Sequence, residues 1–453
     1  MIDSINSMDD GSQAGTPLDK TLKLGIIETA ALRYLDRTLK WHWNLGRNIL
    51  LCWTTAAEGV QVLVAPHFFL GNFTASLTDC APIDRLDALN GSFIRGLIAG
   101  SRYLPPADFK GAASRLELEP VLVTLPVPLL PRPAVVKAID AIVKRYSITY
   151  VKSRAVLLFD IVNFSLVSPF EQTSQLNSLS YSLNSAHNKL LQNNIAVNFS
   201  RTTTGDGFYV WHQNVSPRAN MELFQFMLLV LADNAIVQRA AREGPGVGQV
   251  APQIRAGFHI GSHFEFFQVE GLKPGMNSFI VGDATIELAR MLEKAGPGQV
   301  FMGEFNTQVP TSGREGAYLV TADTEGFVER ANRQSQDLVG VNLSGKQVKA
   351  LHCFLTGVNG VSGGQSVRRF CITDKHGRSR NAYNLRVNIR VSDNHTPIIL
   401  GLQEGNSPKR GERWAGAAAM TRGKGQRVQP VTNRMAGGQR KLVKKPNIPV
   451  MEE

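Results

Sequence analysis

Cysteine is scarce in this chain of 453 residues. The four cysteines, Cys52, Cys80, Cys353 and Cys371, lie far apart and show no paired spacing. Neither a disulfide framework nor a zinc cluster is therefore indicated. A reducing compartment suits such a chain, and we expect the protein to be cytoplasmic.

We also expect neither a secretory leader nor a membrane span in the early part of the chain. Three aspartates fall within the first ten residues, with no apolar core behind a basic region, so no secretory signal is expected. The most apolar early stretch, residues 49–70, is interrupted by Glu58 and other polar residues, which predicts a buried core element in place of a membrane span. With 43% hydrophobic and 19% charged residues, the composition is that of a soluble globular protein of more than one domain.

Shifts in composition along the chain predict its organisation. A Pro-rich run at 125–133 breaks regular structure and indicates a linker. The polar, turn-rich N-terminus is typical of disorder, and the segment after it has apolar patterning of no recognisable class. We predict five segments: disordered residues 1–20, an N-terminal domain of unknown class at 21–124, a Pro-rich linker and helix at 125–150, a larger second domain at 151–403, and a disordered basic tail at 404–453.

The tail carries much of the chain's charge. Residues 404–453 hold 11 Lys or Arg against 4 Glu, a net charge of +7 out of the whole chain's +12. The tail is rich in glycine and has no periodicity, which indicates a flexible, solvated extension. Such a tail attracts nucleic acid or an anionic membrane surface electrostatically. The alternative is a solubilising tail without a specific partner.

A helix is predicted immediately before the second domain. Residues 134–145 repeat apolar side chains with helical spacing and lead directly into an apolar strand. One interpretation is that this helix transmits an input from the N-terminal domain. The other is that it is a packing helix, and we favour the latter.

The first chemically informative residue is Asp160. It follows a continuous apolar run at 155–159, which has the length of a buried strand. A second acid, Asp206, stands in the Gly-Asp-Gly turn of a predicted hairpin formed by 198–203 and 208–211. A segment at 169–191 is long enough for a helix that crosses the sheet between them.

A strand, a crossover helix and a hairpin in that order bring Asp160 and Asp206 to the same end of a sheet, because sequential strands usually neighbour one another. Two carboxylates at one edge suit Mg²⁺ or Mn²⁺, which retain waters and take substrate phosphates as further ligands. Either aspartate alone is better explained as a turn or capping residue, whereas the two together favour the metal.

These residues carry a resemblance to class III adenylate and guanylate cyclases. Residues 159–165 (Phe-Asp-Ile-Val-Asn-Phe-Ser) resemble the first metal-binding signature of that family, and 204–207 (Thr-Gly-Asp-Gly) resemble its second. The interval of 46 residues between the two aspartates is also similar.

Three more motifs follow in the family's order: an Arg-x-Gly-x-His-x-Gly strand at 254–261, a glycine-led helix at 281–293 that includes Arg290, and a strand entry at 297–300. The resemblance spans about 153–304 and resumes at a closing hairpin around Asp374-Lys375-His376-Gly377.

The resemblance implies an α+β, ferredoxin-like cyclase fold and a phosphorus–oxygen lyase in intracellular signalling. Its substrate would be a nucleoside triphosphate, ATP by default, which two Mg²⁺ or Mn²⁺ ions help to convert into a 3′,5′-cyclic nucleotide and pyrophosphate. Two chains would form a homodimer with shared active sites. The residues implied in these roles are Asp160, Ile161 and Asp206 for metal; Arg290 for catalysis; and Asn163, Phe164, Thr202, Gly205, Phe279 and Ile286 for the nucleotide.

Departures from the family pattern affect the choice of base. The family's purine-reading lysine and aspartate are replaced by Thr202 and Phe279, and its ribose-aligning asparagine by Ile286. Asn163 stands in place of a glycine. A pyrimidine nucleotide is therefore an alternative substrate. Without the surrounding motif, Arg290 would be explained as a surface or pairing arginine on an amphipathic helix.

Two non-enzymatic hypotheses also remain open. In one, the domain is a catalytically degenerate nucleotide-binding or regulatory dimerisation module. In the other, the basic tail is the functional part and the cyclase-like domain is its dimerisation scaffold. The joint presence of Asp160, Asp206 and Arg290 favours the enzyme, since these three groups act on phosphate.

Overall fold

The computed structural model describes residues 24–75, 83–195, 197–243, 251–270, 275–313, 316–359, 365–374, 377–392 and 396–401. The segments predicted to be disordered, 1–20 and 404–453, lie outside the described residues, as do Lys375 and His376 of the closing turn.

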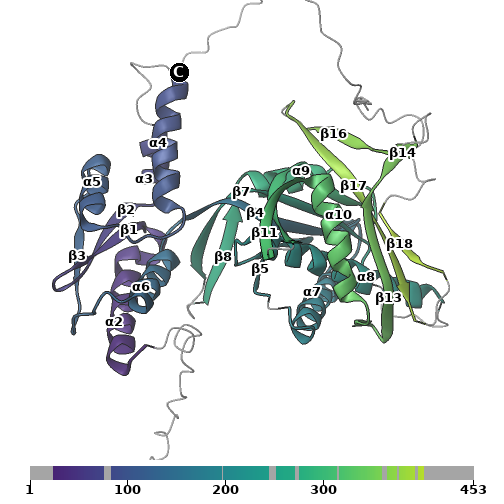
Figure 1. The fold of residues 1–453 in the computed structure, drawn as a ribbon, viewed down its shortest axis with the longest axis horizontal. Helices are drawn as coiled ribbons and strands as arrows, with labels where there is room; N and C mark the ends of the chain where they lie inside the picture. The colour runs from purple at the N-terminus through teal and green to yellow at the C-terminus, as the bar shows by residue number, and fades with distance from the viewer. Residues whose placement is uncertain are drawn as a thin grey trace, which may run out of the picture. The chain divides into compact units, whose positions relative to one another are not determined.

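The first part of the chain forms a three-stranded antiparallel sheet in the order β1-β2-β3 (Figure 1). Its elements are β1 (Asn48–Ala56), β2 (Gly59–Pro66) and β3 (Val121–Thr124), with the helices α2 (Ile26–Trp43), α3 (Phe69–Ala75), α4 (Ile83–Ile98), α5 (Pro106–Leu116) and α6 (Pro133–Arg145). The apolar stretch at 49–70 forms β1, β2 and the start of α3, and Leu50 to Trp53 are fully buried. The prediction of a buried core element is confirmed.

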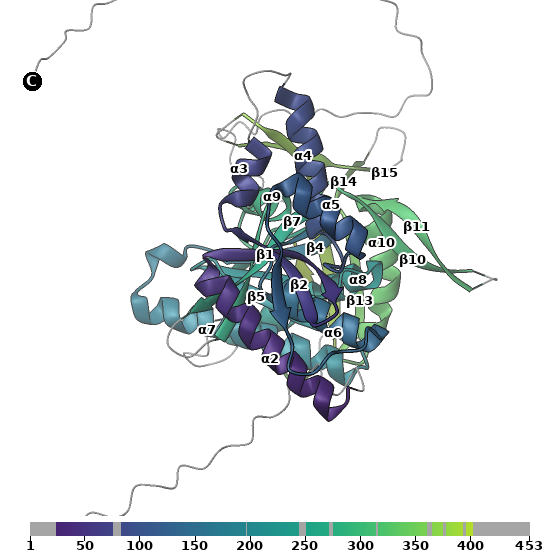
Figure 2. The same ribbon diagram turned by 90° about the vertical axis from the view of Figure 1, so that its left-hand side faces the viewer.

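Alternation along β1 and β2 gives this sheet two apolar faces. Trp53 and Val62 pack with α2 and α6 on one face, whereas Cys52 and Leu63 pack with α4 and α5 on the other. Figure 2 shows α2 and α6 beside the strands that they cover.

The helix predicted at 134–145 is α6, which begins with Pro133 at its first turn. Its buried side chains, such as Val135 and Ile139, share a core with Leu35 and Leu39 of α2. The packing role is therefore confirmed, while a transmitting role stays a hypothesis. Residues 125–132, the centre of the Pro-rich run, lie between β3 and α6 and form neither helix nor strand.

The second part of the chain is built on an 11-stranded sheet within the described residues (Figure 1). Its first half contains β4 (Thr149–Ile161), α7 (Pro169–Gln192), β5 (Phe199–Thr203), β6 (Gly207–His212), α8 (Pro217–Glu243), β7 (Ile254–Glu270), β8 (Gly275–Val281), α9 (Asp283–Leu292) and β9 (Val300–Gly303). The helix predicted at 169–191 and the hairpin at 198–211 are confirmed.

The strand order β7-β4-β6-β5 and the chain order β4-α7-β5-β6-α8-β7 define a ferredoxin-like βαββαβ unit, in which every neighbouring pair is antiparallel. The predicted α+β, ferredoxin-like fold is thereby confirmed. β9 then adds to β7 in parallel, and β17 continues the sheet beyond it.

Side chains of β4 alternate between two helical layers. Leu157 and Phe159 face the core made with α7 and α8, whereas Val156 and Leu158 face the core made with α9. Because strand side chains alternate with a period of two, Asp160 belongs to the α9 side of the sheet.

α8 is the one helix in the described part of the chain that is long and apolar enough to cross a membrane. Its candidate window, Pro217–Ala240, is 94% buried inside the structure. That burial is what a central core helix requires, because apolar residues all round its surface pack against β4, α7 and the strands beyond them.

The rest of the chain extends this sheet and adds two small hairpins. The elements are β10 (Asn306–Gly313), β11 (Gly316–Asp323), α10 (Thr324–Gln334), β12 (Asn342–Leu343), β13 (Lys346–Leu355), β14 (Gly357–Asn359), β15 (Gln365–Val367), β16 (Arg369–Thr373), β17 (Ser379–Val391) and β18 (Ile398–Leu400). β16 pairs with β17 in antiparallel register, so the predicted closing hairpin is present.

Candidate active site

Asp160 lies one residue before the end of β4, at a point where three strands meet. It is opposite Gly207 of β6 on one side and Arg255 of β7 on the other. The residue is only 8% exposed. A carboxylate so well buried needs a partner, because burial without one carries a large desolvation cost.

Asp206 is held beside it by the backbone of the β5–β6 turn. The Ile161 amide donates to the Asp206 carbonyl at 2.9 Å, and the Thr204 hydroxyl donates to Asp206 Oδ1 at 3.1 Å. Gly205 has a φ of +100°, which a side chain would disfavour. The structure therefore brings the two predicted acids together at one end of the sheet.

The two carboxylates influence each other electrostatically. Burial raises the pKa of Asp160, and the neighbouring Asp206 carboxylate adds to this rise, while Arg255 acts in the opposite sense. Two acids with one guanidinium leave one negative charge in excess at a partly desolvated position. A cation would relieve that excess.

Arg255 is a site residue that the sequence-based prediction missed. Its Nε donates to Asp160 Oδ2 at 2.5 Å, and its Nη1 donates to the Ala295 carbonyl at 2.9 Å. The sequence feature that could have indicated Arg255 is its position as the first residue of the Arg-x-Gly-x-His-x-Gly motif. Its contact with Asp160 depends on the register between β4 and β7, which motifs alone do not give.

The donor set fits a hard divalent cation. Carboxylate oxygens are the ligands that Mg²⁺ and Mn²⁺ prefer, and Asp160 and Asp206 supply them side by side. In the described parts of the chain, no group of three or more His, Cys, Asp and Glu could hold a metal. The remaining ligands would therefore be waters, substrate phosphates and backbone oxygens, among which the predicted role of Ile161 remains a prediction.

Asn163 and Phe164 follow directly after β4. Asn163 has a φ of +59°, in the left-handed region where glycine is favoured and asparagine is tolerated. The backbone thus explains why asparagine is accepted at this position. Phe164 packs against the main core and its carbonyl accepts from Gln172, so a contact of either residue with nucleotide stays a prediction.

The positions predicted to contact the base and the ribose lie on three separate elements. Thr202 on β5 is opposite Tyr209 of β6. Phe279 on β8 stacks on Phe266 of β7, with ring centroids 5.8 Å apart. Ile286 on α9 is 50% exposed. No hydrogen bond or ring contact joins these three to one another in the described structure.

Tyr209 is a second residue that the sequence-based prediction missed. Its hydroxyl donates to the Thr285 carbonyl of α9 at 3.0 Å. Burial raises its pKa to about 12, and the charge of Asp160 contributes to the rise. Tyr209 therefore joins β6 to α9, the helix that carries Arg290, at a position that the charge of Asp160 reaches.

Arg290 lies in the last turn of α9 and forms an ion pair with Glu293. No contact with Asp160 or Asp206 is present within the single chain as far as it is described. The role of Arg290 and its supply by a second chain both stay predictions.

The ferredoxin-like strand order is the fold of this part of the chain, and the motifs along it resemble those of class III nucleotidyl cyclases. Solved structures similar to this chain include the adenylyl cyclase CyaB from P. aeruginosa, at 12% identity over 53% of this chain and 95% of that chain, with a TM-score of 0.30. The guanylate cyclase domain of RhGC from Catenaria anguillulae in complex with GTP is similar at 16% identity over 39% of this chain and 98% of that one, with a TM-score of 0.27.

Adenylate cyclases from Trypanosoma brucei in their monomeric state are similar at 13% identity over 52% of this chain and 88% of theirs, with a TM-score of 0.27. These scores are low, so the fold assignment depends on the strand order of this chain itself. No protein-family model and no curated protein matches the sequence.

Proposed function

We propose that this protein is a nucleotidyl cyclase, which converts a nucleoside triphosphate into a 3′,5′-cyclic nucleotide and pyrophosphate in intracellular signalling. The observation that carries this proposal is the pairing of Asp160 with Asp206 at one sheet end, beside the guanidinium of Arg255. Two acids and one arginine at one end of a ferredoxin-like sheet suit a metal-bound triphosphate better than any uncharged ligand.

In this proposal Asp160 and Asp206 would hold Mg²⁺ or Mn²⁺. A bound cation of this kind lowers the pKa of the ribose 3′-hydroxyl and neutralises charge on the triphosphate. Arg255 exchanges its bond to Asp160 for a phosphate oxygen, which a guanidinium binds at least as well as a carboxylate. The 3′-oxygen attacks the α-phosphorus, and pyrophosphate leaves.

Arg290 is proposed to act from a second copy of the chain. Its guanidinium would leave Glu293 and stabilise the negative charge that builds on the transferred phosphoryl group. Donors that are already oriented toward such charge are worth about 3 kcal/mol of barrier. The active form would therefore be a homodimer with shared sites.

ATP is the default substrate, and a pyrimidine nucleotide is the alternative. Thr202 offers a hydroxyl and Phe279 an aromatic face, which are sufficient for hydrogen bonding and stacking to a base. Neither supplies the charged purine contacts of the related family.

A second candidate function is a nucleotide-binding or regulatory module without turnover. The contact of Phe279 with Phe266 favours it, because this ring is already stacked within the protein. The exposed Ile286 adds to this, since it offers no hydrogen bond to ribose.

The decisive test is to incubate the full chain with each of the four ribonucleoside triphosphates and Mn²⁺, and to measure cyclic nucleotide and pyrophosphate. Asp160→Asn should lower turnover by at least about 100-fold, because the metal loses a charged ligand. Asp108→Asn, which neutralises an exposed acid on α5, is the matched control and should keep full turnover. Nucleotide binding without any cyclic product would establish the second candidate function.

A further inference from the structure

One face of the large sheet carries exposed side chains where β13, β17 and β18 pair. On the opposite face of these strands, Leu351 of β13 and Val387 of β17 belong to the main core, with α8 and α10 on that side (Figure 1). Because strand side chains alternate between two faces, the residues next to them point away from these helices. In the sheet order, β9 and β7 separate β17 from β4. The exposed face therefore shares no residue with the Asp160–Asp206 site, and its ligand is independent of the proposed cyclase activity.

Positively charged side chains and one aromatic ring occupy this face. Phe354 of β13 stands directly opposite Arg386 of β17. Further along the same pair of strands, a register shift leaves Lys349 as an extra residue of β13 beside the position of Arg390. Lys349, Arg390 and the intervening His352 are exposed, and Arg386 is partly buried. We call these five residues the basic face.

No acid on these strands balances the positive charges. β13, β17 and β18 contain neither Asp nor Glu. Arg380, nearer the start of β17, is paired with two acids from other elements. In contrast, Lys349, Arg386 and Arg390 form no ion pair with another described residue. The basic face therefore offers three positive charges to a ligand from outside the described structure.

Charge also excludes two occupants that the chain itself could supply. Residues 404–453, which follow β18 in the sequence, carry a net charge of +7. A second copy of the basic face is positive as well. Like charges brought together in this way repel, so neither segment is a favourable cover for the face. The complementary partner is a polyanion, which would be attracted by the face and by the basic tail together.

Phe354 selects among polyanions. Its side chain is 43% exposed although it stands beside a guanidinium in the middle of a sheet. Exposed aromatic rings and arginine planes on an antiparallel sheet stack with unpaired bases. The bases of a duplex are stacked on one another and are not free to do so. Arg386 and Arg390 are four residues apart on one face, or about 14 Å, which is the length of about four stacked nucleotides.

We propose that the basic face binds single-stranded nucleic acid. Phosphates would lie at Lys349, Arg386 and Arg390, and a base would stack on Phe354. The tail would add attraction that depends on salt and not on sequence. Because these contacts are to phosphates and to the flat face of a base, they favour single strands without selecting a particular sequence.

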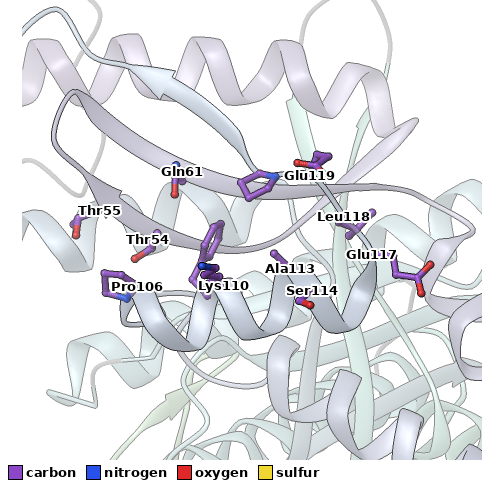
Figure 3. A pocket seen from close by; sticks show the side chains of 12 residues that line it. Thr54, Thr55, Gln61, Pro106, Lys110, Ala113, Ser114, Glu117, Leu118 and Glu119 are labelled. Carbon is purple, nitrogen blue, oxygen red and sulfur yellow. The ribbon is translucent and has the colours of Figure 1, made fainter.

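The test is fluorescence anisotropy of the full chain with a labelled oligouridine of about 12 nucleotides, a length that spans such a site. A DNA duplex of the same length is the comparison. We expect saturable binding of the single strand, with a log–log salt slope of at least about −2 for three phosphate contacts. Arg390→Gln should weaken the single strand and the duplex alike and reduce the single-strand slope by about 0.7. Lys110→Gln removes an exposed charge beside a cavity of the N-terminal sheet (Figure 3). It is the matched control and should change the Kd less than twofold.

Phe354→Leu separates stacking from charge. It should weaken the single strand by at least about fivefold, the lower end of the effect of one stacked base. Duplex binding and the salt slope should stay unchanged, because no charge is removed. Phe354→Tyr keeps the ring and should keep the affinity for the single strand. Equal melting temperatures of the leucine and tyrosine variants would show that the loss does not come from misfolding.

Three results would overturn the proposal. The first is an absence of saturable oligouridine binding at about 50 mM salt, where such contacts are strong. The second is an affinity for oligouridine that Arg390→Gln and Phe354→Leu both leave unchanged, which would assign all binding to the tail. The third is binding to phosphatidylserine vesicles without binding to oligouridine, which would assign the basic face to a membrane surface.

Discussion

Arg255 and Asp160 are the two side chains on which the chemistry of the sheet end depends. Their bond gives the free protein an internal counter-ion at the place where a metal would otherwise take the charge. The same guanidinium also binds the Ala295 carbonyl, so it is held from two sides. Binding of the proposed metal would therefore compete with an existing ion pair.

Arg255→Gln should bind Mn²⁺ more tightly than the wild type in the absence of nucleotide. Removing the guanidinium frees Asp160 Oδ2 and removes a like charge, and we expect the Kd to fall by about tenfold, or about 1.4 kcal/mol. Titration of free Mn²⁺ by electron paramagnetic resonance measures this directly. Lys294→Gln removes an exposed positive charge nearby and should change the Kd less than twofold, in line with weak surface charge effects. Weaker Mn²⁺ binding by Arg255→Gln would mean that the arginine orients Asp160 for the metal.

Three histidines are buried on the strands next to the site. His212, His259 and His263 are at most 9% exposed. Burial lowers their pKa values to about 4 for His212 and His259 and to about 3 for His263. The charge of Arg154 contributes to the lowering at His212 and His263. All three are neutral in the folded protein at pH 5 to 7.

These histidines should make the protein less stable as the pH falls. Below about pH 6.5 the unfolded chain gains protons that the folded chain does not, so stability is fully present above pH 6.5 and is lost as the pH falls toward 4. Each histidine should lower the free energy of unfolding by about 1 kcal/mol per pH unit in this window.

Urea unfolding of the full chain between pH 7 and 5 measures this slope. His263→Gln should reduce the slope by about one proton, and His352→Gln, which changes an exposed histidine, should leave it unchanged. An unchanged slope in His263→Gln would show that His263 is protonated in the folded state.

At the scale of elements, the carboxylate pair depends on how closely β6 approaches β4. A Cβ placed on Gly207 would lie 1.9 Å from the Phe159 carbonyl oxygen. Only glycine fits there, because the contact is with backbone and not with a movable side chain. The turn that presents Asp206 is attached to β4 through this approach.

Gly207→Ala should therefore destabilise the protein and loosen the metal site together. We expect a loss of about 3 kcal/mol in the free energy of unfolding, since the two strands must separate. Gly111→Ala on α5 is the opposite case, because a Cβ there meets nothing within 4 Å. It should gain about 0.5–1 kcal/mol by restricting the unfolded chain. Denaturant unfolding of both variants tests the pair, and a Gly207→Ala protein as stable as the wild type would contradict the close approach.

The elements themselves were largely predictable from the sequence, whereas their contacts were not. The hairpin around Asp206 and the helix α7 are determined locally by turn residues and by capping, and the prediction placed both within about two residues of their observed ends. The contact of Arg255 with Asp160 depends on long-range strand register, and that of Tyr209 with α9 on tertiary packing. The class of the N-terminal sheet was not predicted for the same reason, since β3 joins the β1–β2 hairpin from a distant segment of the chain.

At the scale of the whole molecule, the proposed active site would draw on two chains. The acids are on β4 and the β5–β6 turn, while Arg290 is paired with Glu293 on α9. Val281 and Ile286, at the end of β8 and on α9, are about half exposed. A second chain placed against α9 would cover these apolar side chains and could bring its own acids to Arg290.

Shared sites can be tested by mixing two inactive variants. Asp160→Asn and Arg290→Ala should each have little activity alone, the latter because about 3 kcal/mol of barrier stabilisation is lost. In a heterodimer, the intact Asp160 of one chain meets the intact Arg290 of the other. Random pairing of equal amounts makes half of the dimers mixed, and each mixed dimer has one working site, so about a quarter of the wild-type activity should return.

The control mixture pairs Asp160→Asn with Asp206→Asn. No combination of these chains assembles both acids in one site, so it should stay inactive. If the wild type is active and the first mixture stays as inactive as its components, Asp160 and Arg290 must serve the same site from one chain. Rescue is possible only where each site takes Asp160 from one chain and Arg290 from the other. A wild type without any activity would instead count against the cyclase proposal itself, so the two failures are distinguishable.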